Sequence, residues 1–397
     1  MIPAAAPPQT IPVARPSIGA EELEAVRRPL ASGWLTQGPE VAAFEREFAA
    51  FVEAPHACAV SNCTTALHLA LRAAGVRPGD EVITVSHSFI ATANAIRYCG
   101  AMPVFVDVNP ATYNIDPSRI AAVMTARTRA ILAVHQLGMP CDLATVIEIA
   151  RRHHVPVIED AACAAGSEIE FRGRWERIGR PHGDIACFSF HPRKVLTTGD
   201  GGMLTTANPE WDRQFRLWRQ HAMSVSDQAR HSSREVVTEQ YTELGYNYRL
   251  TDLQAAIGRV QLSRLPATVA RRREIAARYH ARLRGIPGLH LPFEPAWARS
   301  NWQSYCVRLP DGVDQSRVMQ SMLDEGISTR RGVMCAHLEP AYSREPWHAQ
   351  SSGALTVSER ISADGLILPL YVDMTEADES RVVSSLERAI SREEQQP

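Results

Sequence analysis

The chain has 397 residues and a formal net charge of -2, with 45% hydrophobic and 22% charged residues. These values are ordinary for a globular protein with one large and one smaller domain, and they exclude an intrinsically disordered chain. The arginines are scattered or in short doublets, and no run approaches the roughly 20 apolar residues of a spanning helix, so we expect neither nucleic acid nor a membrane as a partner.

The amino-terminal residues combine several prolines with little apolar periodicity, which predicts a mobile tail over residues 1–12. The same stretch lacks the basic start and unbroken apolar run of a signal peptide, so we expect a cytoplasmic protein. From Glu21 to about Ala74 the spacing of apolar residues predicts a largely helical region.

Short apolar runs then alternate with helical patterns up to about Leu265. Apolar strands joined by helices predict a mostly parallel sheet that is buried on both faces, and therefore a large α/β domain over residues 13–265. The expected strands are 81–85, 103–106, 130–134 and 155–158, and the expected helices are 90–96, 117–124 and 143–153.

Beyond Arg271 the pattern changes to a long helical stretch, a strand over residues 302–309, two further helical patterns and a final helix over 376–390. We therefore predict a smaller C-terminal α+β domain over residues 266–397.

The loop from Ser189 to Gly202 contains Lys194 among hydroxyl residues and then three glycines in four positions. A solvated lysine before a hairpin turn is the ordinary explanation of such a stretch. However, Asp160 lies at the end of an apolar strand, which is where open α/β sheets bind their ligands. Pyridoxal phosphate requires a lysine for its Schiff base and an acid against its pyridine nitrogen, and both are present.

A phosphate group would also need a binding site, and the stretch from Ser61 to His68 offers hydroxyls and backbone N–H groups at the start of a helix. Taken alone, Thr64 and Thr65 are more often a simple helix cap. The eight cysteines are scattered without a C-x-x-C pair or a histidine cluster, so we expect no metal and a reducing compartment.

Several further blocks follow one another in a characteristic order along the chain, and with the lysine loop they resemble the DegT/DnrJ/StrS family of sugar aminotransferases. This family has the fold type I of pyridoxal-phosphate enzymes, and the resemblance extends from about Ile11 to the final helix. The blocks are GWLTQGP (33–39), GDEVI (79–83), FIATANAI (89–96), GYNYR (245–249), QAAIG (254–258) and LPLY (368–371).

The resemblance implies a role for each matching residue. Lys194 would hold the cofactor and shuttle a proton, Asp160 would bind the pyridine nitrogen, and Phe89 would lie against one face of the ring. Without the family, Phe89 would be interpreted as core packing. Many members carry a glutamine that contacts the cofactor's ring oxygen where this chain has Cys163, and a thiol is a weaker hydrogen-bonding group.

The resemblance also implies a phosphate site made by Thr64, Thr65 and Ser189, with Asn247 reaching it from the partner subunit. Asn247 therefore predicts a homodimer with shared active sites, although a turn residue beside Gly245 is the simpler interpretation of this position. The dehydratase branch of the family replaces the lysine with histidine, so Lys194 places this chain with the transaminases.

The function that this implies is transfer of an amino group, with L-glutamate as donor, to a nucleotide-linked keto sugar, most often a 4-keto-6-deoxyhexose. Arg249, Arg330, Arg331 and His337 are the candidate substrate-binding residues, because guanidinium groups suit diphosphates and carboxylates. Either arginine of the Arg330–Arg331 doublet could equally be a surface charge. The alternatives are amination of a keto-cyclitol and a non-catalytic regulator that retains the fold, and the latter would need a basic helix-turn-helix segment.

Overall fold

The computed structural model describes residues 10–225, 230–231, 233–349 and 355–394. An eight-stranded sheet lies at its centre, in the order β1-β9-β8-β5-β4-β2-β3-β13. Strand β9 runs antiparallel to both neighbours and every other pair is parallel, so the predicted α/β fold with a mostly parallel sheet is confirmed. The strands are β1 His56–Val60, β2 Glu81–Val85, β3 Met102–Val106, β4 Thr128–Val134, β5 Val157–Asp160, β8 Ile185–Ser189, β9 Gly202–Thr206 and β13 His348–Ala349.

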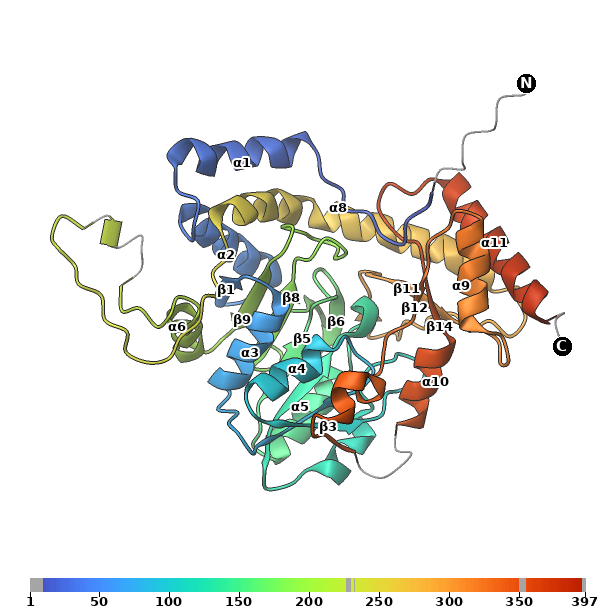
Figure 1. Ribbon diagram of the computed structural model, residues 1–397, viewed down its shortest axis with the longest axis horizontal. Coiled ribbons are helices and arrows are strands. Elements are labelled where there is room, and N and C mark those ends of the chain that lie inside the picture. The colour runs from blue at the N-terminus through green and yellow to red at the C-terminus, as the bar shows by residue number, and fades with distance from the viewer. Residues whose placement is uncertain (1–9, 226–229, 232, 350–354, 395–397) are drawn as a thin grey trace.

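Helices cover both faces of this sheet (Figure 1). Apolar residues of α2, α5 and α8 pack on one face, and those of α3, α4 and α6 pack on the other. Within β2, Ile83 belongs to the first core and Val82 to the second, as the two-residue alternation of a strand requires. The helices are α1 Ala20–Ser32, α2 Pro39–Val52, α3 Cys63–Ala73, α4 Ala91–Tyr98, α5 Leu143–Arg152, α6 Pro209–Trp218 and α8 Asp252–Leu283.

The region from Glu21 to Ala74 is largely helical, as predicted, but it also contains the edge strand β1, whose alanines and cysteine carry no β-branched signal. The free edge of β1 is satisfied by side chains: Glu45 accepts a bond from the Ala59 N–H at 2.9 Å, and Arg219 donates to the Ala59 carbonyl at 2.7 Å. Residues 117–124 form two short 3₁₀ turns instead of a helix.

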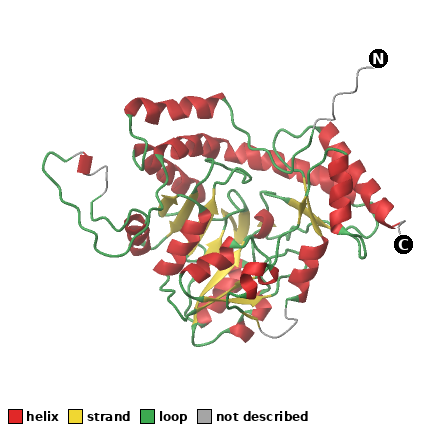
Figure 2. Ribbon diagram, in the orientation of Figure 1, coloured by secondary structure: helices red, strands yellow, loops and turns green. Residues whose placement is uncertain are grey.

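A second group of strands lies apart from the central sheet (Figure 2). It contains β11 Tyr305–Arg308, β14 Gly365–Leu368 and β12 Arg330–Arg331. These strands share a separate core with α9 Gln315–Asp324, α11 Glu376–Glu394 and the second half of α8. That core supports the proposed C-terminal domain, although Pro266 at its proposed boundary lies inside the continuous helix α8. The remaining elements are β6 Glu168–Phe171, β7 Arg174–Arg177, β10 Ala298–Arg299 and α10 Thr356–Asp364.

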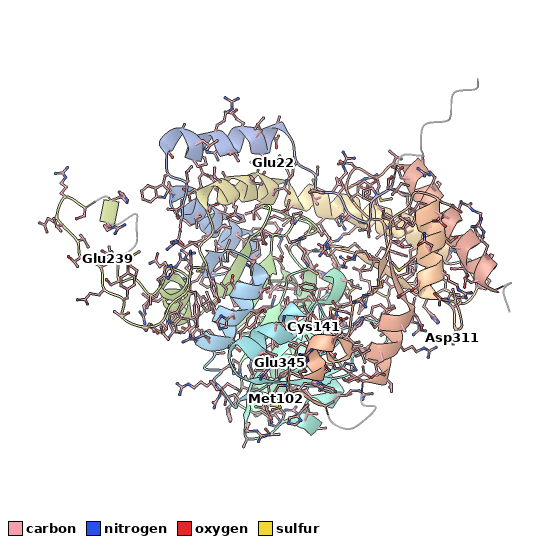
Figure 3. The ribbon with its side chains drawn as sticks, in the orientation of Figure 1. Glu22, Met102, Cys141, Glu239, Asp311 and Glu345 are labelled. Atoms are coloured by element: carbon pink, nitrogen blue, oxygen red, sulfur yellow. The ribbon has the colours of Figure 1, made fainter. Side chains whose placement is uncertain are left out.

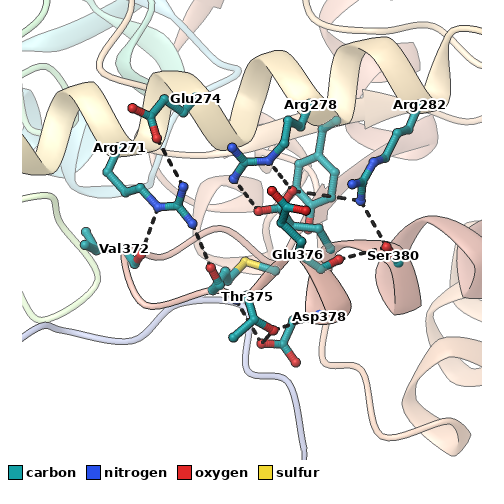
Figure 4. A network of polar contacts seen from close by, with 12 residues as sticks. Arg271, Glu274, Arg278, Arg282, Val372, Thr375, Glu376, Asp378 and Ser380 are labelled. Carbon is teal, nitrogen blue, oxygen red and sulfur yellow. Dashed lines mark hydrogen bonds and ion pairs between the residues drawn. The ribbon is translucent and has the colours of Figure 1, made fainter.

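Arginines of α8 hold the C-terminal segment in place (Figure 4). Arg278 donates to both carboxylate oxygens of the fully buried Glu379, at 2.7 and 2.6 Å. Arg271 donates to the carbonyl of Met374 at 2.9 Å. At the other end of α8, the buried Glu22 of α1 lies between the two helices and accepts a bond from Gln261 at 2.7 Å (Figure 3). Helix α8 therefore joins the two cores.

The fold begins earlier in the sequence than the predicted tail allows. Ile11 is buried because its apolar side chain packs in the C-terminal core. Its backbone N–H also donates to the Gly326 carbonyl at 2.9 Å. The part of the predicted tail over residues 1–9 lies outside the described residues. In the described part of the chain, no helix has the length and apolar character that crossing a membrane requires.

Candidate active site

The residues that the sequence singled out meet at the carboxyl edge of the central sheet. Asp160 is the last residue of β5, and Ser189 is the last residue of the neighbouring strand β8. Ser189 pairs with Gly202 of β9, and Gly202 pairs with Val60 of β1. Only strand β9 therefore separates the stretch that follows β1 from Ser189.

Gly202 allows this close approach. A Cβ atom at this position would lie 2.5 Å from the carbonyl carbon of Asn62 and 2.8 Å from the nitrogen of Cys63, which no side chain tolerates. The start of α3 can therefore pack directly against β9. This brings the proposed phosphate site at the start of α3 beside Ser189.

Lys194 lies in the loop that joins β8 to β9, and the loop is closed by its own hydrogen bonds. The N–H of Phe190 donates to Gly201 at 2.8 Å, and the N–H of Lys194 donates to His191 at 2.8 Å. The Nζ atom of Lys194 lies 3.0 Å from the Sγ of Cys163. Burial lowers the pKa of Lys194, but the adjoining Cys163, with Cys63 and Asp160, outweighs it and raises the pKa above its usual value.

Asp160 is 5% exposed and is held through both carboxylate oxygens. The hydroxyl of Thr92 donates to Oδ2 at 2.8 Å, and the N–H of Ala162 donates to Oδ1 at 3.2 Å. Ser88 in turn contacts the Thr92 hydroxyl at 2.7 Å. A carboxylate oxygen can accept more than one hydrogen bond, so Asp160 keeps the capacity to bind a protonated nitrogen.

Thr92 was not among the predicted site residues. Its signal in the sequence was its place in the FIATANAI block.

The start of α3 has the groups that a phosphate requires. Asn62 caps the helix by accepting the N–H of Thr65 at 2.9 Å, and the Thr65 hydroxyl donates back to the Asn62 carbonyl at 2.7 Å. Thr65 thus acts as a capping residue, as the simpler interpretation held. The Thr64 hydroxyl has no hydrogen-bond partner among the described residues, and the first N–H groups of a helix lack intrahelical acceptors.

Phe89 does not pack in a core. Its side chain is 62% exposed, immediately before α4, and its carbonyl accepts the N–H of Thr92 at 3.0 Å. An exposed aromatic ring next to a residue that binds Asp160 is suited to cover a flat ligand. The lysine, the carboxylate, the aromatic ring and the phosphate site together fit pyridoxal phosphate.

Positive charges gather beside the lysine loop. Burial lowers the pKa of His191, as do the charges of Arg193, Lys194 and Arg330, with Asp200 opposing. Burial and then Arg193 likewise lower the pKa of Arg330. The His191 ring is therefore kept neutral, and the neighbouring positive charges of Arg193 and Arg330 are suited to attract an anionic ligand.

The other three candidate substrate residues differ in their surroundings. Arg331 forms an ion pair with Glu339 at 2.9 Å, as a surface charge would. Both ring nitrogens of His337 are engaged, with Ser86 at 2.6 Å and Glu359 at 3.1 Å, so a ligand would have to displace one of these contacts. The guanidinium of Arg249 makes no ion pair or hydrogen bond with a described residue.

Asn247 is exposed and lies in a segment that passes the start of the phosphate site. The N–H of Ser61 donates to the carbonyl of Tyr248 at 2.8 Å, and Asn247 forms a bridge with Gln220. The Asn247 side chain has no hydrogen-bond partner among the described residues of its own chain.

A model of the DegT/DnrJ/EryC1/StrS aminotransferase family matches residues 16–387. The spore coat polysaccharide biosynthesis protein SpsC of Bacillus subtilis is 39% identical over 95% of this chain and 96% of its own length. The GDP-perosamine synthase of Caulobacter vibrioides is 38% identical over 96% of this chain and 98% of its own length.

Solved structures agree with these matches. The aminotransferase TlmJ from Streptoalloteichus hindustanus is 37% identical with a TM-score of 0.85, over 96% of this chain and 99% of that one. The sugar aminotransferase Spr1654 from Streptococcus pneumoniae, solved in its PLP form, is 25% identical with a TM-score of 0.88, over 97% of this chain and 99% of that one. Pyridoxal phosphate is thus the cofactor.

Proposed function

Because the chain belongs to the DegT/DnrJ/EryC1/StrS aminotransferase family, we propose that this pyridoxal-phosphate-dependent sugar aminotransferase moves an amino group from L-glutamate to a nucleotide-diphosphate-linked 4-keto-6-deoxyhexose. The observation that carries the choice of an anionic substrate is the group of positive charges formed by Arg193 and Arg330 beside Lys194.

The bound cofactor supplies an electron sink for the carbon that loses a proton. In our proposal, Lys194 would hold the cofactor, and its Nζ, once displaced by the amine of the substrate, would move a proton between the nitrogen-bearing carbon of the substrate and the aldehyde carbon of the cofactor. Asp160 keeps a proton on the pyridine nitrogen through its negative charge, and Phe89 covers one face of the ring. The hydroxyls of Thr64 and Ser189, with the first N–H groups of α3, bind the phosphate.

The same cations serve the two substrates in our proposal. The diphosphate of the sugar and the side-chain carboxylate of glutamate are both anions that a guanidinium binds well. We assign the contact with the diphosphate to Arg330. A relative named as a GDP-perosamine synthase supports a nucleotide-linked sugar as the acceptor, whereas a neutral keto-cyclitol would leave these cations without a counter-charge.

We also propose a homodimer in which Asn247 of the partner subunit reaches the phosphate. The described residues between α6 and α8 reach away from the body of the chain (Figure 1). They expose large apolar side chains, with Val236 at 99%, Leu244 at 83% and Tyr241 at 60%. Such a surface favours contact with another copy.

The test is to incubate the loaded enzyme and glutamate with a panel of nucleotide-linked 4-keto and 3-keto sugars and keto-cyclitols, and to follow aminated product by mass. We expect product from a nucleotide-linked 4-keto sugar, with kcat/KM reduced at least tenfold in an Arg330→Gln variant. Product from the keto-cyclitols alone would contradict the proposed substrate.

A further inference from the structure

The segment from Asn301 to Gln303 contacts the backbone on both sides of the Lys194–Cys163 pair. We infer that Gln303 is a positioning residue, which holds the loop so that the amine of Lys194 reaches the aldehyde carbon of the cofactor. This inference rests on the proposed role of Lys194 and concerns a residue more than 100 positions away in sequence.

Gln303 binds the two peptide groups that flank Lys194. Its Oε1 accepts the N–H of Val195 at 3.0 Å, and its Nε2 donates to the carbonyl of Arg193 at 2.5 Å. Its side chain is 8% exposed, so these bonds compete little with water. One amide therefore fixes the backbone immediately before and immediately after the lysine.

Asn301 holds the other member of the pair in the same way. Its Nδ2 donates to the carbonyl of Cys163 at 2.8 Å and to that of Ala165 at 2.9 Å. Its Oδ1 accepts the backbone N–H of Gln303 at 2.8 Å, so Asn301 also fixes the backbone that carries the Gln303 side chain. The distance between Lys194 and Cys163 is thus set from a third segment of the chain.

The segment itself is held in a conformation that it would not adopt alone. Trp302, between the two amides, has a φ of 51°, which is in the left-handed region and costs about 1 kcal/mol or more for a residue with a side chain. Arg272 of α8 donates to the carbonyls of Trp302 at 2.9 Å and Gln303 at 2.7 Å. Gly138 lies so close that a Cβ there would meet the Asn301 Oδ1, with no room between them.

Backbone strain maintained by a buried arginine and two amides is typical of a functional site, because folding alone would not favour it. The bonds of Gln303 act on the lysine loop and not on the start of α3, where the phosphate binds. Removing them should therefore slow the reaction of Lys194 with an aldehyde and leave binding through the phosphate unchanged.

Pyridoxal phosphate and pyridoxamine phosphate separate these two effects, because only the first has an aldehyde that reacts with Lys194. We would prepare cofactor-free parent, Gln303→Leu and Gln303→Glu proteins, add pyridoxal phosphate, and trap the bond with borohydride at timed intervals. Mass spectrometry then gives the rate of labelling at Lys194. The dissociation constant of pyridoxamine phosphate and the melting temperature are measured alongside.

Gln315→Leu is the matched control. Gln315 also donates to backbone carbonyls, those of Gly365 at 2.6 Å and Ser362 at 3.3 Å, but it lies in the C-terminal domain away from the lysine loop. The control should label at the parent rate.

For Gln303→Leu we expect labelling of Lys194 to slow about tenfold or more, since two buried hydrogen bonds are lost, with pyridoxamine phosphate affinity within twofold of the parent. Gln303→Glu keeps the acceptor for the Val195 N–H, so its rate of Lys194 labelling should fall between those of the parent and of Gln303→Leu. This variant gives a readout if the leucine variant does not fold. Unchanged labelling, or an equal loss of pyridoxamine phosphate affinity, would overturn the inference. A parent protein labelled elsewhere than Lys194 would instead overturn the proposed function.

Discussion

Replacing Asp160 by asparagine removes the negative charge at the end of β5 and almost nothing else. Asparagine has the same size, and one amide oxygen can still accept the N–H of Ala162, now 3.2 Å from the carboxylate. The Thr92 hydroxyl, 2.8 Å from the other oxygen, can accept from the new amide instead of donating. We therefore expect the fold to survive.

The magnitude follows from the charge that is lost. A hydrogen bond to a charged group contributes about 1.5–3 kcal/mol, and two unit charges about 3 Å apart at an effective dielectric constant of about 20 interact by roughly 5 kcal/mol. Because Asp160 is buried, we take the upper values of about 3–5 kcal/mol; since about 1.4 kcal/mol corresponds to tenfold in rate, Asp160→Asn should lower kcat by about 10²–10⁴-fold.

The assay is steady-state turnover of a substrate found in the panel, with melting temperature and pyridoxamine phosphate affinity as checks on folding. Asp142→Asn is the matched control, because Asp142 accepts the Thr145 N–H as the cap of α5 and asparagine caps equally well. An Asp160→Asn enzyme within tenfold of the parent would refute the assignment of Asp160 to the pyridine nitrogen.

Three further predictions concern the pKa of the lysine, the docking of α10 and the assembly. Cys163→Ala removes the neighbour that contributes most to raising the pKa of Lys194, while burial, which lowers this pKa, remains along with the smaller effects of Cys63 and Asp160. Pyridoxal phosphate should therefore attach faster at neutral pH, and the pH profile of attachment should shift to lower pH. An unmoved profile would contradict this. Asp107→Ala should lower the free energy of unfolding by about 2–4 kcal/mol in urea titrations. The reason is that the buried Asp107 carboxylate accepts the N–H groups of Val357 at 2.9 Å and Ser358 at 2.8 Å. A loss below about 0.5 kcal/mol would show that α10 docks without this carboxylate. A heterodimer of one Lys194→Ala chain and one Asn247→Ala chain should recover about half of the parent activity, since one site would carry both changes and the other neither. Activity no higher than in the mutant homodimers would assign Asn247 to its own chain's site.

The parts of the site that were predictable have local signatures. Apolar strands alternate with helices, so the position of Asp160 at a carboxyl end could be read from the sequence. Lys194 stands out because of the glycines that follow it. Phe89 and Ser189 belong to sequence blocks that resemble the family, and the high exposure of Phe89 agrees with its proposed ligand-covering role.

The residues that hold this site in shape left no such signature. Gln303 and Asn301 act on peptide groups 108 to 138 residues away, and an amide that binds a backbone carbonyl has no characteristic spacing in sequence. Strand β1 was missed for a similar reason, because its edge is completed by Arg219, which follows α6 more than 150 residues later in the chain. The proposed boundary at Pro266 falls inside α8 because one helix serves both cores.

If Lys194 enables amino transfer to a nucleotide-linked keto sugar, the amino nitrogen of glutamate must reach the sugar, and isotope labelling follows this atom. Glutamate labelled in its amino nitrogen is supplied with a nucleotide-linked 4-keto-6-deoxyhexose, and the sugar product is weighed by mass spectrometry for parent and Lys194→Ala enzymes. We expect the label in the amino sugar made by the parent and none with the variant, which should still bind pyridoxamine phosphate. Labelled product from Lys194→Ala at a tenth of the parent rate or more would contradict this role of Lys194.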